Sequence, residues 1–371
     1  MDIRIATNEA EWESFLQAQE WTPFLQSFPM GEVYRAVGEE PVRLEVREGA
    51  GARIVGICQA IMVNAKRGRH LAIMYGPVFH DGLGEELRVS SFLFLVETLI
   101  QVAREKNCTF IRMSPFWQKN FLEETSNQKL VTRNLFKPSF RPSPLHLLAE
   151  HIWFLNLRGK TEEDIRKNMR STTRNLIGRA EREGVTIELS TDPVADLHHF
   201  LKLHEETRRR HSFTPYTNDF FRAQVEIFSR PRPSPNPSPT CALYLARYQG
   251  EVISASVHMI YGGETSYHHG ASTGKYAKIP ASYLLQWRAI QDALRRGDRV
   301  YNFWGIAPLR SSGSPNSQFP IPKHPFAGVT TFKTGFGGEL LELEHCMDLP
   351  LSKKYFLTWG IETVRKWRRG F

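Results

Sequence analysis

The sequence predicts a mixed α/β protein with mixed sheets, divided into two domains. Its 371 residues exceed the roughly 250–300 residues that a single hydrophobic core usually supports. Helical and strand patterns alternate along the chain, which is typical of layered α/β structures. The two halves also share one order of elements, in which helices are followed by consecutive strands, a helix and a final strand. We therefore expect a fold that is duplicated at the level of element order.

Periodicity in the first half predicts two helices and four strands. The helices are expected at 11–19 and 85–106, and the strands at 42–47, 53–63, 70–78 and 108–113. Residues 114–150 contain several prolines and show no regular period. They are therefore expected to form an irregular connection.

The second half begins with a predicted strand and a helix-start signal. Thr161 followed by Asp164 is a capping-box pattern, which predicts a single helix that runs to about Glu183. Further helices are expected at 194–210, 218–228 and 281–296, and strands at 151–157, 185–189, 242–248, 252–261, 264–269 and 300–304. The proline-rich stretches 229–240 and 307–327 are predicted to be loops.

The charge balance of the chain is basic, with a formal charge of +9 from 48 lysines and arginines against 39 acidic residues. This balance favours a polyanionic partner, namely a nucleic acid, a phosphorylated substrate or an anionic membrane. The alternative is that the charge serves solubility alone. No run approaches the ~18 apolar residues of a spanning helix, and the N-terminus lacks the pattern of a signal peptide. We therefore expect a cytoplasmic protein, with any membrane contact peripheral to the inner face of the plasma membrane.

The cysteines and histidines show no metal-site spacing. The four cysteines are Cys58, Cys108, Cys241 and Cys346. They are isolated, which argues against a zinc site and a disulfide framework and fits a reducing compartment. His198, His199, His204 and His211 do not form HExxH and lack an acidic residue at the right offset. We expect no bound metal.

Three pairs of segments in the second half resemble the Fem family of peptidoglycan-bridge aminoacyltransferases. They are 153–157 with 167–185, 270–272 with 280–287, and 301–306 with 328–338. The last pair, YNFWGI and GVTTFKTGFGG, is the most specific. In the first half, Gln26-Ser27 and the segment Gly76-Pro77-Val78 follow the family pattern more weakly.

The resemblance implies two tandem acetyltransferase-like (GNAT-like) domains. The first would comprise 1–149 with 346–371 and bind the precursor, and the second, 150–345, would carry the catalytic lysine and a tRNA-binding surface. The implied reaction moves an amino acid from aminoacyl-tRNA to a stem-peptide amine of a UDP-linked or lipid-linked muropeptide precursor. No heptad-patterned arm is present, so the chain resembles the shorter, armless type. A monomer is expected, with no cofactor besides aminoacyl-tRNA as co-substrate.

Lys333 is the expected catalytic residue. Transfer from an ester to an amine needs little driving force, which agrees with the absence of a GxxxxGK[ST] loop. What the reaction needs is alignment and stabilisation of the oxyanion. Lys333 lies between Phe332 and Phe336 among glycines that permit close approach to a ligand. Its cation can stabilise the oxyanion or bind the terminal phosphate of tRNA. The alternative is an ordinary lysine at the end of a strand.

A cluster of basic residues on the helix after Thr161 is the expected tRNA-binding surface. It consists of Arg166, Lys167, Arg170 and Arg174. Three of these arginines recur every four residues, so they are predicted to share one helix face, where they can displace counterions from a phosphodiester backbone. The alternative is a solvated helix face with acidic partners.

Several residues are expected to bind the peptide precursor. The resemblance assigns the diphosphate to Arg210, although a cation that merely complements a helix C-terminus is the simpler reading. Tyr216, His269 and Phe332 are expected beside it. Strand alternation predicts that His269 faces the groove and His268 the core, unless His269 is simply packed.

In the first domain, three residues are expected to contact the precursor. Tyr75 precedes the Gly-Pro-Val segment. Tyr34 stands where family members often carry a lysine, and Arg35 beside it can supply the charge. If this segment is a strand, the Arg35 side chain points the opposite way from that of Tyr34.

Two other functions compete with aminoacyl transfer. One is acyl-CoA-dependent N-acyl transfer, but the segment before Ala281 lacks the Q/R-x-x-G-x-G/A loop that cradles a pyrophosphate. The other is a non-catalytic RNA- or envelope-binding protein of the same fold. The basic, tryptophan-containing C-terminus, 353–371, can lie on anionic lipid, pack on the first domain or bind tRNA.

Overall fold

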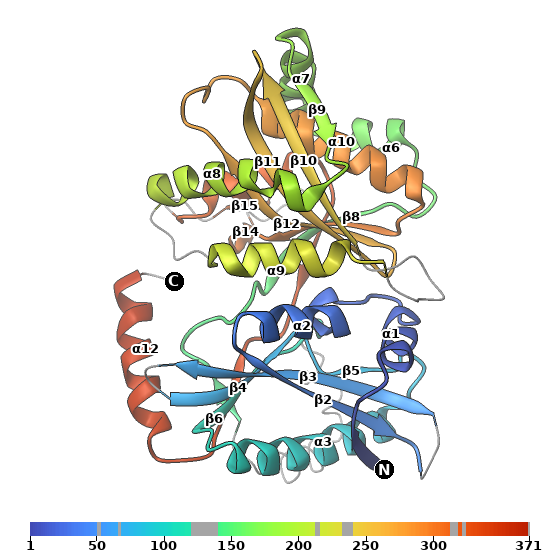
Figure 1. Ribbon diagram of the computed structural model, residues 1–371, viewed down its shortest axis with the longest axis vertical. Helices are drawn as coiled ribbons and strands as arrows, with labels where there is room; N and C mark the ends of the chain where they lie inside the picture. Colours follow the sequence, from blue (N-terminus) through green and yellow to red (C-terminus); the bar gives the residue numbers. More distant parts are fainter. Residues whose placement is uncertain are drawn as a thin grey trace. The chain divides into compact units, whose positions relative to one another are not determined.

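The computed structural model describes residues 1–49, 53–65, 68–119, 140–211, 216–231, 240–311, 318–320 and 324–369. Its chain divides into two compact units, each with a mixed sheet and helices on both faces (Figure 1). The first unit contains 1–150 and 342–371, and the second contains 151–232 and 237–341. The centres of the two predicted loops, 232–239 and 312–317 with 321–323, lie outside the described residues.

The first unit is built on a sheet with the order β1-β2-β3-β4-β6-β17-β7, in which β5 also pairs with β3. Its strands are β1 (Asp2–Ile5), β2 (Glu40–Arg47), β3 (Ile54–Ala65), β4 (Gly68–Met74), β5 (Val78–Phe79), β6 (Phe110–Ser114), β7 (Arg141–Pro142) and β17 (Met347–Pro350). Its helices are α1 (Glu9–Gln17), α2 (Phe28–Ala36), α3 (Glu85–Glu105) and α12 (Tyr355–Arg369). Neighbouring strands are antiparallel except for β4 and β6, which are parallel.

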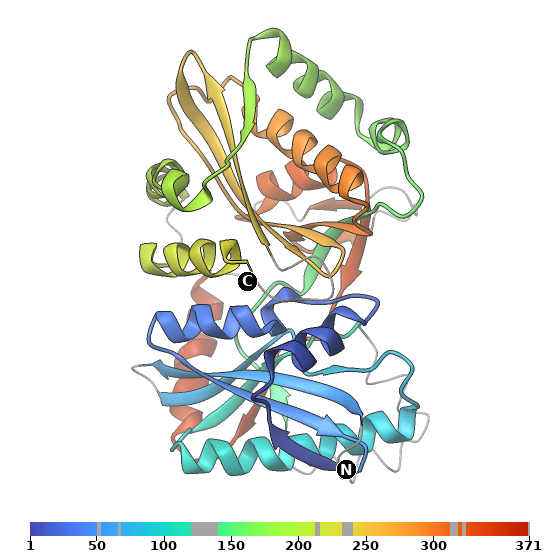
Figure 2. The same ribbon diagram turned by 45° about the vertical axis from the view of Figure 1, so that its right-hand side comes forward.

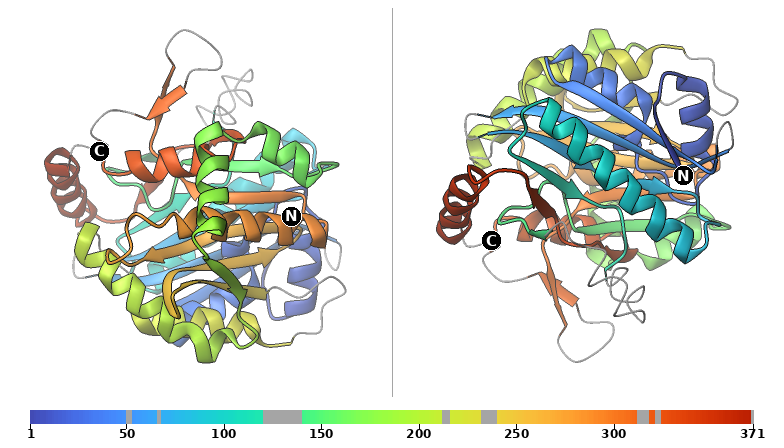
Figure 3. Two further views of the ribbon diagram at one scale, coloured as in Figure 1. Left: turned by 90° about the horizontal axis from the view of Figure 1, so that it is seen from above. Right: turned by 90° about the horizontal axis from the view of Figure 1, so that it is seen from below.

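Helices cover both faces of this first sheet. In Figure 1, α1 and α2 lie over one face and α3 over the other, and the view from below in Figure 3 shows α3 crossing the strands. The apolar stripe of α3, which includes Leu95 and Leu99, is fully buried against Val55 and Ile73 of the sheet. Removal of this apolar surface from water is the main stabilising contribution to the unit.

The C-terminal strand and helix are held in the first unit by a buried ion network. Arg112 of β6 bonds both carboxylate oxygens of Asp348 of β17, at 2.7 and 2.8 Å. The same guanidinium bonds Glu362 of α12 at 2.7 Å, and the hydroxyl of Tyr355 donates to Asp348 at 3.0 Å. The last residues of the chain therefore complete the sheet that the first residues begin.

The second unit contains a sheet with the order β16-β8-β13-β12-β11-β10-β9. Its strands are β8 (His151–Asn156), β9 (Thr186–Leu189), β10 (Thr240–Tyr248), β11 (Glu251–Tyr261), β12 (Glu264–Ser272), β13 (Val300–Gly305) and β16 (Glu339–Glu342), and β14 (Leu309–Ser311) pairs separately with β15 (Gln318–Pro320). Its helices are α6 (Glu162–Asn168), α7 (Ser171–Arg182), α8 (Pro193–His211), α9 (Asn218–Ser229), α10 (Ala281–Arg296) and α11 (Ala327–Thr334). Figure 2 shows α8 and α9 on one side of this sheet and α10 on the other.

The mixed α/β prediction is confirmed, two predicted elements are corrected and two open alternatives are decided. The predicted loop 307–327 contains the short paired strands β14 and β15. The segment that carries Tyr34 and Arg35 is helix α2 and not a strand, because Ser27 accepts the Met30 N–H as an N-cap and starts a helix. The single helix predicted to run to Glu183 is two helices. The segment around Lys333 is a helix and not the end of a strand.

No helix among the described residues combines the length and apolar character that crossing a bilayer requires.

Candidate functional site

Lys333 lies in the last turn of α11, and its ammonium points back to the end of β13. Its Nζ donates a hydrogen bond to the Gly305 carbonyl oxygen at 2.6 Å and lies 5.8 Å from the centre of the Tyr267 ring. Only 7% of the residue is exposed. Burial lowers the pKa of Lys333 from 10.5 to about 7, because the charged amine loses its hydration.

The glycines after Lys333 serve the packing of the protein's own backbone. Gly337 and Gly338 adopt φ values of +81° and +106°, which favour glycine. A Cβ on Gly338 would collide with the carbonyl oxygen of Phe154 in β8, and a Cβ on Gly337 would lie 2.9 Å from the Asn168 carbonyl oxygen. We expected these glycines to allow a ligand to approach the backbone. The structure corrects this, because the space beside them is filled by the backbone of β8 and of the end of α6.

Phe332 contributes to the same packing. Its ring lies 4.8 Å from that of Tyr283 and 5.5 Å from that of Phe336, in edge-to-face arrangements with both rings. Phe332 is half-buried against the core of the second unit. The structure therefore gives this side chain a packing role beside its predicted contact with substrate.

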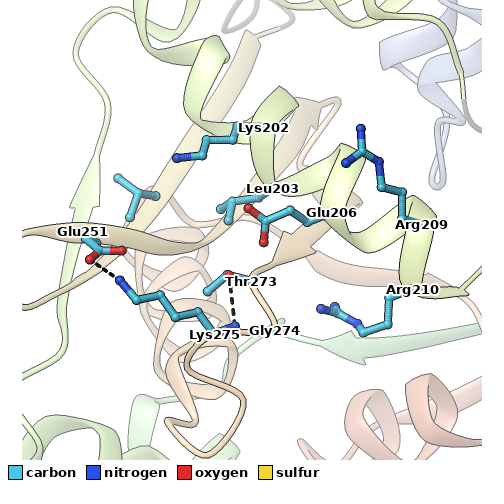
Figure 4. A pocket seen from close by; sticks show the side chains of 10 residues that line it. Lys202, Leu203, Glu206, Arg209, Arg210, Glu251, Thr273, Gly274 and Lys275 are labelled. Carbon is cyan, nitrogen blue, oxygen red and sulfur yellow. Dashed lines mark hydrogen bonds and ion pairs between the residues drawn. The ribbon is translucent and has the colours of Figure 1, made fainter.

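Arg210 lines a cavity of about 760 Å³ in the second unit (Figure 4). The lining comes from α8, from the start of β11 and from the turn after β12, and consists of Lys202, Leu203, Glu206, Arg209, Arg210, Glu251, Val252, Thr273, Gly274 and Lys275. The Arg210 guanidinium points toward the turn and donates to the carbonyl and hydroxyl oxygens of Ser272 at 3.2 and 3.4 Å.

The charges around this cavity favour an anion. Four of its lining residues are cationic and two are acidic. Lys275 pairs with Glu251 at 2.5 Å, and this hydrogen bond lowers the pKa of Glu251. Arg209 pairs with Glu205 outside the cavity at 2.9 Å. The cations outnumber the carboxylates, and arginine matches the geometry of phosphate oxygens.

Tyr216 and His269 meet in an aromatic cluster beside α9. The two rings are 5.7 Å apart, and Phe221 contacts His269 at 4.8 Å. Tyr216 stacks on Phe220 at 4.3 Å and is 46% exposed. Burial lowers the pKa of His269 well below its ordinary value, so this imidazole is neutral at physiological pH.

The predicted alternation of His268 and His269 is wrong. Val257 of β11 pairs with His269, and the next residue, His258, pairs with Tyr267, so His268 is the extra residue of a β-bulge. The bulge brings the two imidazole rings to 3.9 Å instead of placing them on opposite faces. The side-chain alternation of a strand fails wherever its register shifts.

The predicted arginine stripe does not lie on one helix face. The backbone of Met169 and Arg170 is extended, so α6 ends before them and α7 begins after them. Met169, at this break, is 3% exposed and packs in the core of the second unit. Arg170 donates to Thr331 and Thr334 of α11, and Arg174 donates to carbonyl groups at the end of α6.

Arg166 and Lys167 remain exposed in the last turn of α6. Arg170 is also exposed, but its guanidinium bonds α11, and Arg174 is half-buried, so two residues of the predicted tRNA-binding set bond neighbouring helices. Hydrogen-bonding partners of Arg170 and Arg174 come from the tertiary fold, which explains why residue spacing did not reveal them.

The first-unit candidates differ in their accessibility. Tyr34 is 5% exposed, and its hydroxyl contacts the Met74 sulfur at 3.2 Å. Tyr75 is 1% exposed and donates to the Ala149 carbonyl oxygen at 2.7 Å. Arg35 has a 55% exposed side chain, which pairs with Glu32 at 2.5 Å. Of these three, Arg35 is the one whose charged group meets solvent.

The cavity around Arg210 also contains residues that sequence reasoning missed. Lys202 and Arg209 are one heptad apart on α8, a spacing that places them on neighbouring parts of one face. The turn with Gly274 and Lys275 belongs to the segment before Ala281, whose sequence lacks the pyrophosphate-binding loop of acyl-CoA-dependent enzymes and gives no other signal of a binding site. Lys333 and Phe332 do not line this cavity.

Comparisons with known proteins give a consistent family assignment. The profile of the FemAB family matches residues 7–231, and that of the acetyltransferase (GNAT) domain matches residues 164–310. Aminoacyltransferase FemA of Staphylococcus aureus (strain MW2) is 21% identical, with 93% of this chain and 96% of the relative covered. Aminoacyltransferase FemB of Staphylococcus epidermidis (strain ATCC 12228 / FDA PCI 1200) is 22% identical, with 73% of this chain and 78% of the relative covered.

Solved structures share the fold. FemX has a TM-score of 0.75 at 15% identity, with 98% of this chain and 100% of that chain covered. A tandem GNAT protein from the clavulanic acid biosynthesis pathway has a TM-score of 0.53 at 12% identity, with 93% and 95% covered. The prediction of two tandem acetyltransferase-like domains is confirmed.

Proposed function

The chain belongs to the FemAB family of aminoacyltransferases, and from that premise we propose that it transfers an amino acid from aminoacyl-tRNA to a stem-peptide amine of a muropeptide precursor. The products are deacylated tRNA and a precursor that carries an amino acid of the future peptidoglycan cross-bridge. The observation that carries the substrate assignment is the cation-rich cavity around Arg210, whose lining suits the diphosphate of a UDP-linked or lipid-linked precursor. Of the three first-unit candidates, Arg35 keeps its proposed contact with the precursor because its side chain is exposed, whereas Tyr34 and Tyr75 are buried and their hydroxyls bond within the unit.

The reaction exchanges one acyl bond for another. The amine nitrogen attacks the ester carbonyl carbon, a C–N bond forms, and the C–O bond to the tRNA ribose breaks. The proton that leaves the amine ends on the ribose oxygen. An ester is more activated than an amide, so the transfer proceeds without ATP. The enzyme contributes alignment of the reactants and stabilisation of the tetrahedral oxyanion.

Lys333 is the catalytic residue in this proposal. With a pKa of about 7, it populates both protonation states near neutral pH. Its ammonium form donates a hydrogen bond to the oxyanion, and this interaction is strong where water is excluded. The Lys333 amine donates to the Gly305 carbonyl. To donate to the substrate, it either uses a second N–H or gives up this hydrogen bond. Buried lysines with lowered pKa values are concentrated at functional sites.

The exposed end of α6 is the proposed contact for tRNA. Arg166 and Lys167 face solvent there, while Arg170 and Arg174 fix the position of α6 against α7 and α11. Phosphate contacts by exposed cations depend on salt, because binding releases counterions. We expect Arg166→Ala combined with Lys167→Ala to weaken tRNA binding and to lower its salt dependence. An unchanged salt slope contradicts this assignment.

The outer face of α12 is the proposed contact with the inner face of the plasma membrane. Leu357, Val364 and Trp367 are 72%, 50% and 83% exposed, and Arg365 and Arg368 lie beside them. An apolar helix face flanked by cations binds anionic lipid surfaces. We expect the protein to co-sediment with phosphatidylglycerol vesicles and not with phosphatidylcholine vesicles. Equal sedimentation of wild type and Trp367→Ser argues against this contact.

The decisive test of the function is a transfer assay with a pool of charged tRNAs. UDP-linked and lipid-linked precursors are supplied separately, and the product is identified by its mass increase. We expect one amino acid to be added to one of the two acceptors. No mass increase with either acceptor, together with micromolar binding of acetyl-CoA, would favour acyl-CoA-dependent transfer instead.

A further inference from the structure

Two histidines and one glutamate converge in the first unit, and none of the three has been assigned a role above. Nδ1 of His146 lies 2.8 Å from a Glu150 carboxylate oxygen, and Nδ1 of His345 lies 2.9 Å from the same oxygen. One ligand atom from each of the three side chains lies within 4.8 Å of the others. His146 and Glu150 lie at the end of the stretch 1–150 of the first unit. His345 lies near the start of its second stretch, 342–371.

The hydrogen-bond pattern requires a positive species at the centre of this cluster. Nε2 of His345 lies 2.9 Å from the Ser143 carbonyl oxygen, to which it donates its proton. In the neutral ring, Nδ1 then carries a lone pair, yet it faces a carboxylate that only accepts hydrogen bonds. The opposed lone pairs are relieved either by a second proton on His345 or by a metal ion.

The surroundings of the cluster match those of a metal centre. The Cys346 backbone N–H donates to Glu150 at 2.9 Å and orients the carboxylate. The Ser143 carbonyl orients His345 through its remote nitrogen, as carbonyl groups commonly do for metal-binding histidines. The Glu150 side chain is 9% exposed, whereas those of His345 and His146 are 35% and 47% exposed. One side of the cluster is therefore open to water as a further ligand.

We propose that His146, Glu150 and His345 bind a divalent transition-metal ion, and that Zn²⁺ is the ion that fits best. Two imidazole nitrogens and one carboxylate oxygen form a common three-ligand set for zinc, with a fourth position left for water. Bond lengths of about 2.0–2.1 Å in a tetrahedron separate the ligand atoms by about 3.3 Å. The two nitrogen–oxygen separations of 2.8 and 2.9 Å therefore need to open by about half an ångström, and the two imidazole nitrogens, which lie within 4.8 Å of each other, need to reach the same separation.

The proposed ion has a structural consequence that does not depend on the transfer reaction. The ion joins the end of the stretch 1–150 to the start of the stretch 342–371. These segments are distant in sequence, so an ion that binds only the folded arrangement stabilises it against unfolding. The distance in sequence also explains why spacing motifs did not reveal the site.

The test uses full-length protein prepared without a metal-affinity tag and stripped with a chelator. Zn²⁺ binding is measured by calorimetry, and Co²⁺ binding by visible absorption, which reports tetrahedral coordination. We expect one ion per chain and a rise in the unfolding temperature. His146→Ala should weaken binding at least tenfold and abolish the thermal shift. Because the His146 side chain is 47% exposed, we expect this variant to keep the fold.

The matched control is His198→Ala on α8. His198 and His199 have ring centres 4.0 Å apart, so they form a histidine pair that can bind metal adventitiously. We expect His198→Ala to bind Zn²⁺ as the wild type does. The proposal is overturned if stripped wild type binds no ion, if His146→Ala binds as tightly as wild type, or if only His198→Ala loses binding. Any of these results would show that a second proton on His345, and not a metal ion, relieves the opposed lone pairs.

Discussion

The two units each bury a cation, and they treat it in opposite ways. In the first unit, Arg112 bonds two carboxylates, those of Asp348 and Glu362. Burial alone would lower the pKa of Arg112, but these bonds raise it above its ordinary value. In the second unit, Lys333 is equally buried, and among the residues that the structure describes its ammonium bonds a carbonyl oxygen and no carboxylate. Burial therefore lowers the pKa of Lys333, because no carboxylate among the described residues bonds the ammonium and raises the pKa again.

This difference separates a structural cation from one that is available for chemistry. A buried charge that is fully paired holds elements together, and its removal leaves its partners uncompensated. A buried charge without a counter-ion destabilises the fold, but it offers its charge and its proton to a ligand. Three substitutions give four tests of this comparison, and the expected effects decrease in the order given.

Breaking the paired cation should have the largest effect. Arg112→Met leaves Asp348, which is 0% exposed, with a buried negative charge. We expect the free energy of unfolding to fall by about 3–5 kcal/mol, as measured by urea denaturation. The matched control is Arg53→Met, whose exposed side chain lies 3.8 Å from Glu48 and should contribute less than about 1 kcal/mol. Equal effects of the two substitutions would contradict the structural role of Arg112.

Removing the unpaired cation should affect turnover. We expect Lys333→Met to lower the rate of transfer at least tenfold, which corresponds to about 1.4 kcal/mol, because the oxyanion loses its donor. The measurement is the mass-shift assay under saturating substrates, with circular dichroism to confirm folding. Lys160→Met, at an exposed lysine of the same unit, serves as the control. Wild-type turnover in Lys333→Met would remove Lys333 from the mechanism.

The same substitution should stabilise the fold in a pH-dependent way. The pKa of Lys333 is about 7 when folded and 10.5 ordinarily, so between these values the unfolded chain binds more protons. The stability of wild type should therefore rise with pH in this window. We expect Lys333→Met to unfold at a higher temperature than wild type at pH 7 and below, and the difference to shrink toward pH 10. A difference that stays constant with pH would show that the ammonium is not buried.

Arg210 should show the smallest effect of the four, because its role is to bind. We expect Arg210→Ala to raise KM for the precursor several-fold with little change in kcat, since a diphosphate contact is formed in both the ground and transition states. Arg222→Ala provides an exposed arginine from α9 as the control. A loss in kcat at unchanged KM would place Arg210 with Lys333 in the chemical step.

Local signals in the sequence predicted much of the fold. The helix 281–296 was predicted with the bounds that α10 has, because Gly297 ends it in the left-handed conformation. The capping box of Thr161 and Asp164 is present as predicted. The resemblance to the family was most specific in the segments 301–306 and 328–338, and the family assignment is confirmed by the FemAB match over residues 7–231.

What the sequence determined by itself was the order of elements, the family and the identity of the residues that carry charge. Each depends on residues close together along the chain, whose periodicity and spacing can be read directly. The tertiary structure alone decided which charges are paired, where α6 and α7 separate to bury Met169, and how the bulge at His268 brings two imidazoles together. It also decided that His345 meets His146 and Glu150. These outcomes depend on contacts between distant segments, which no local pattern contains.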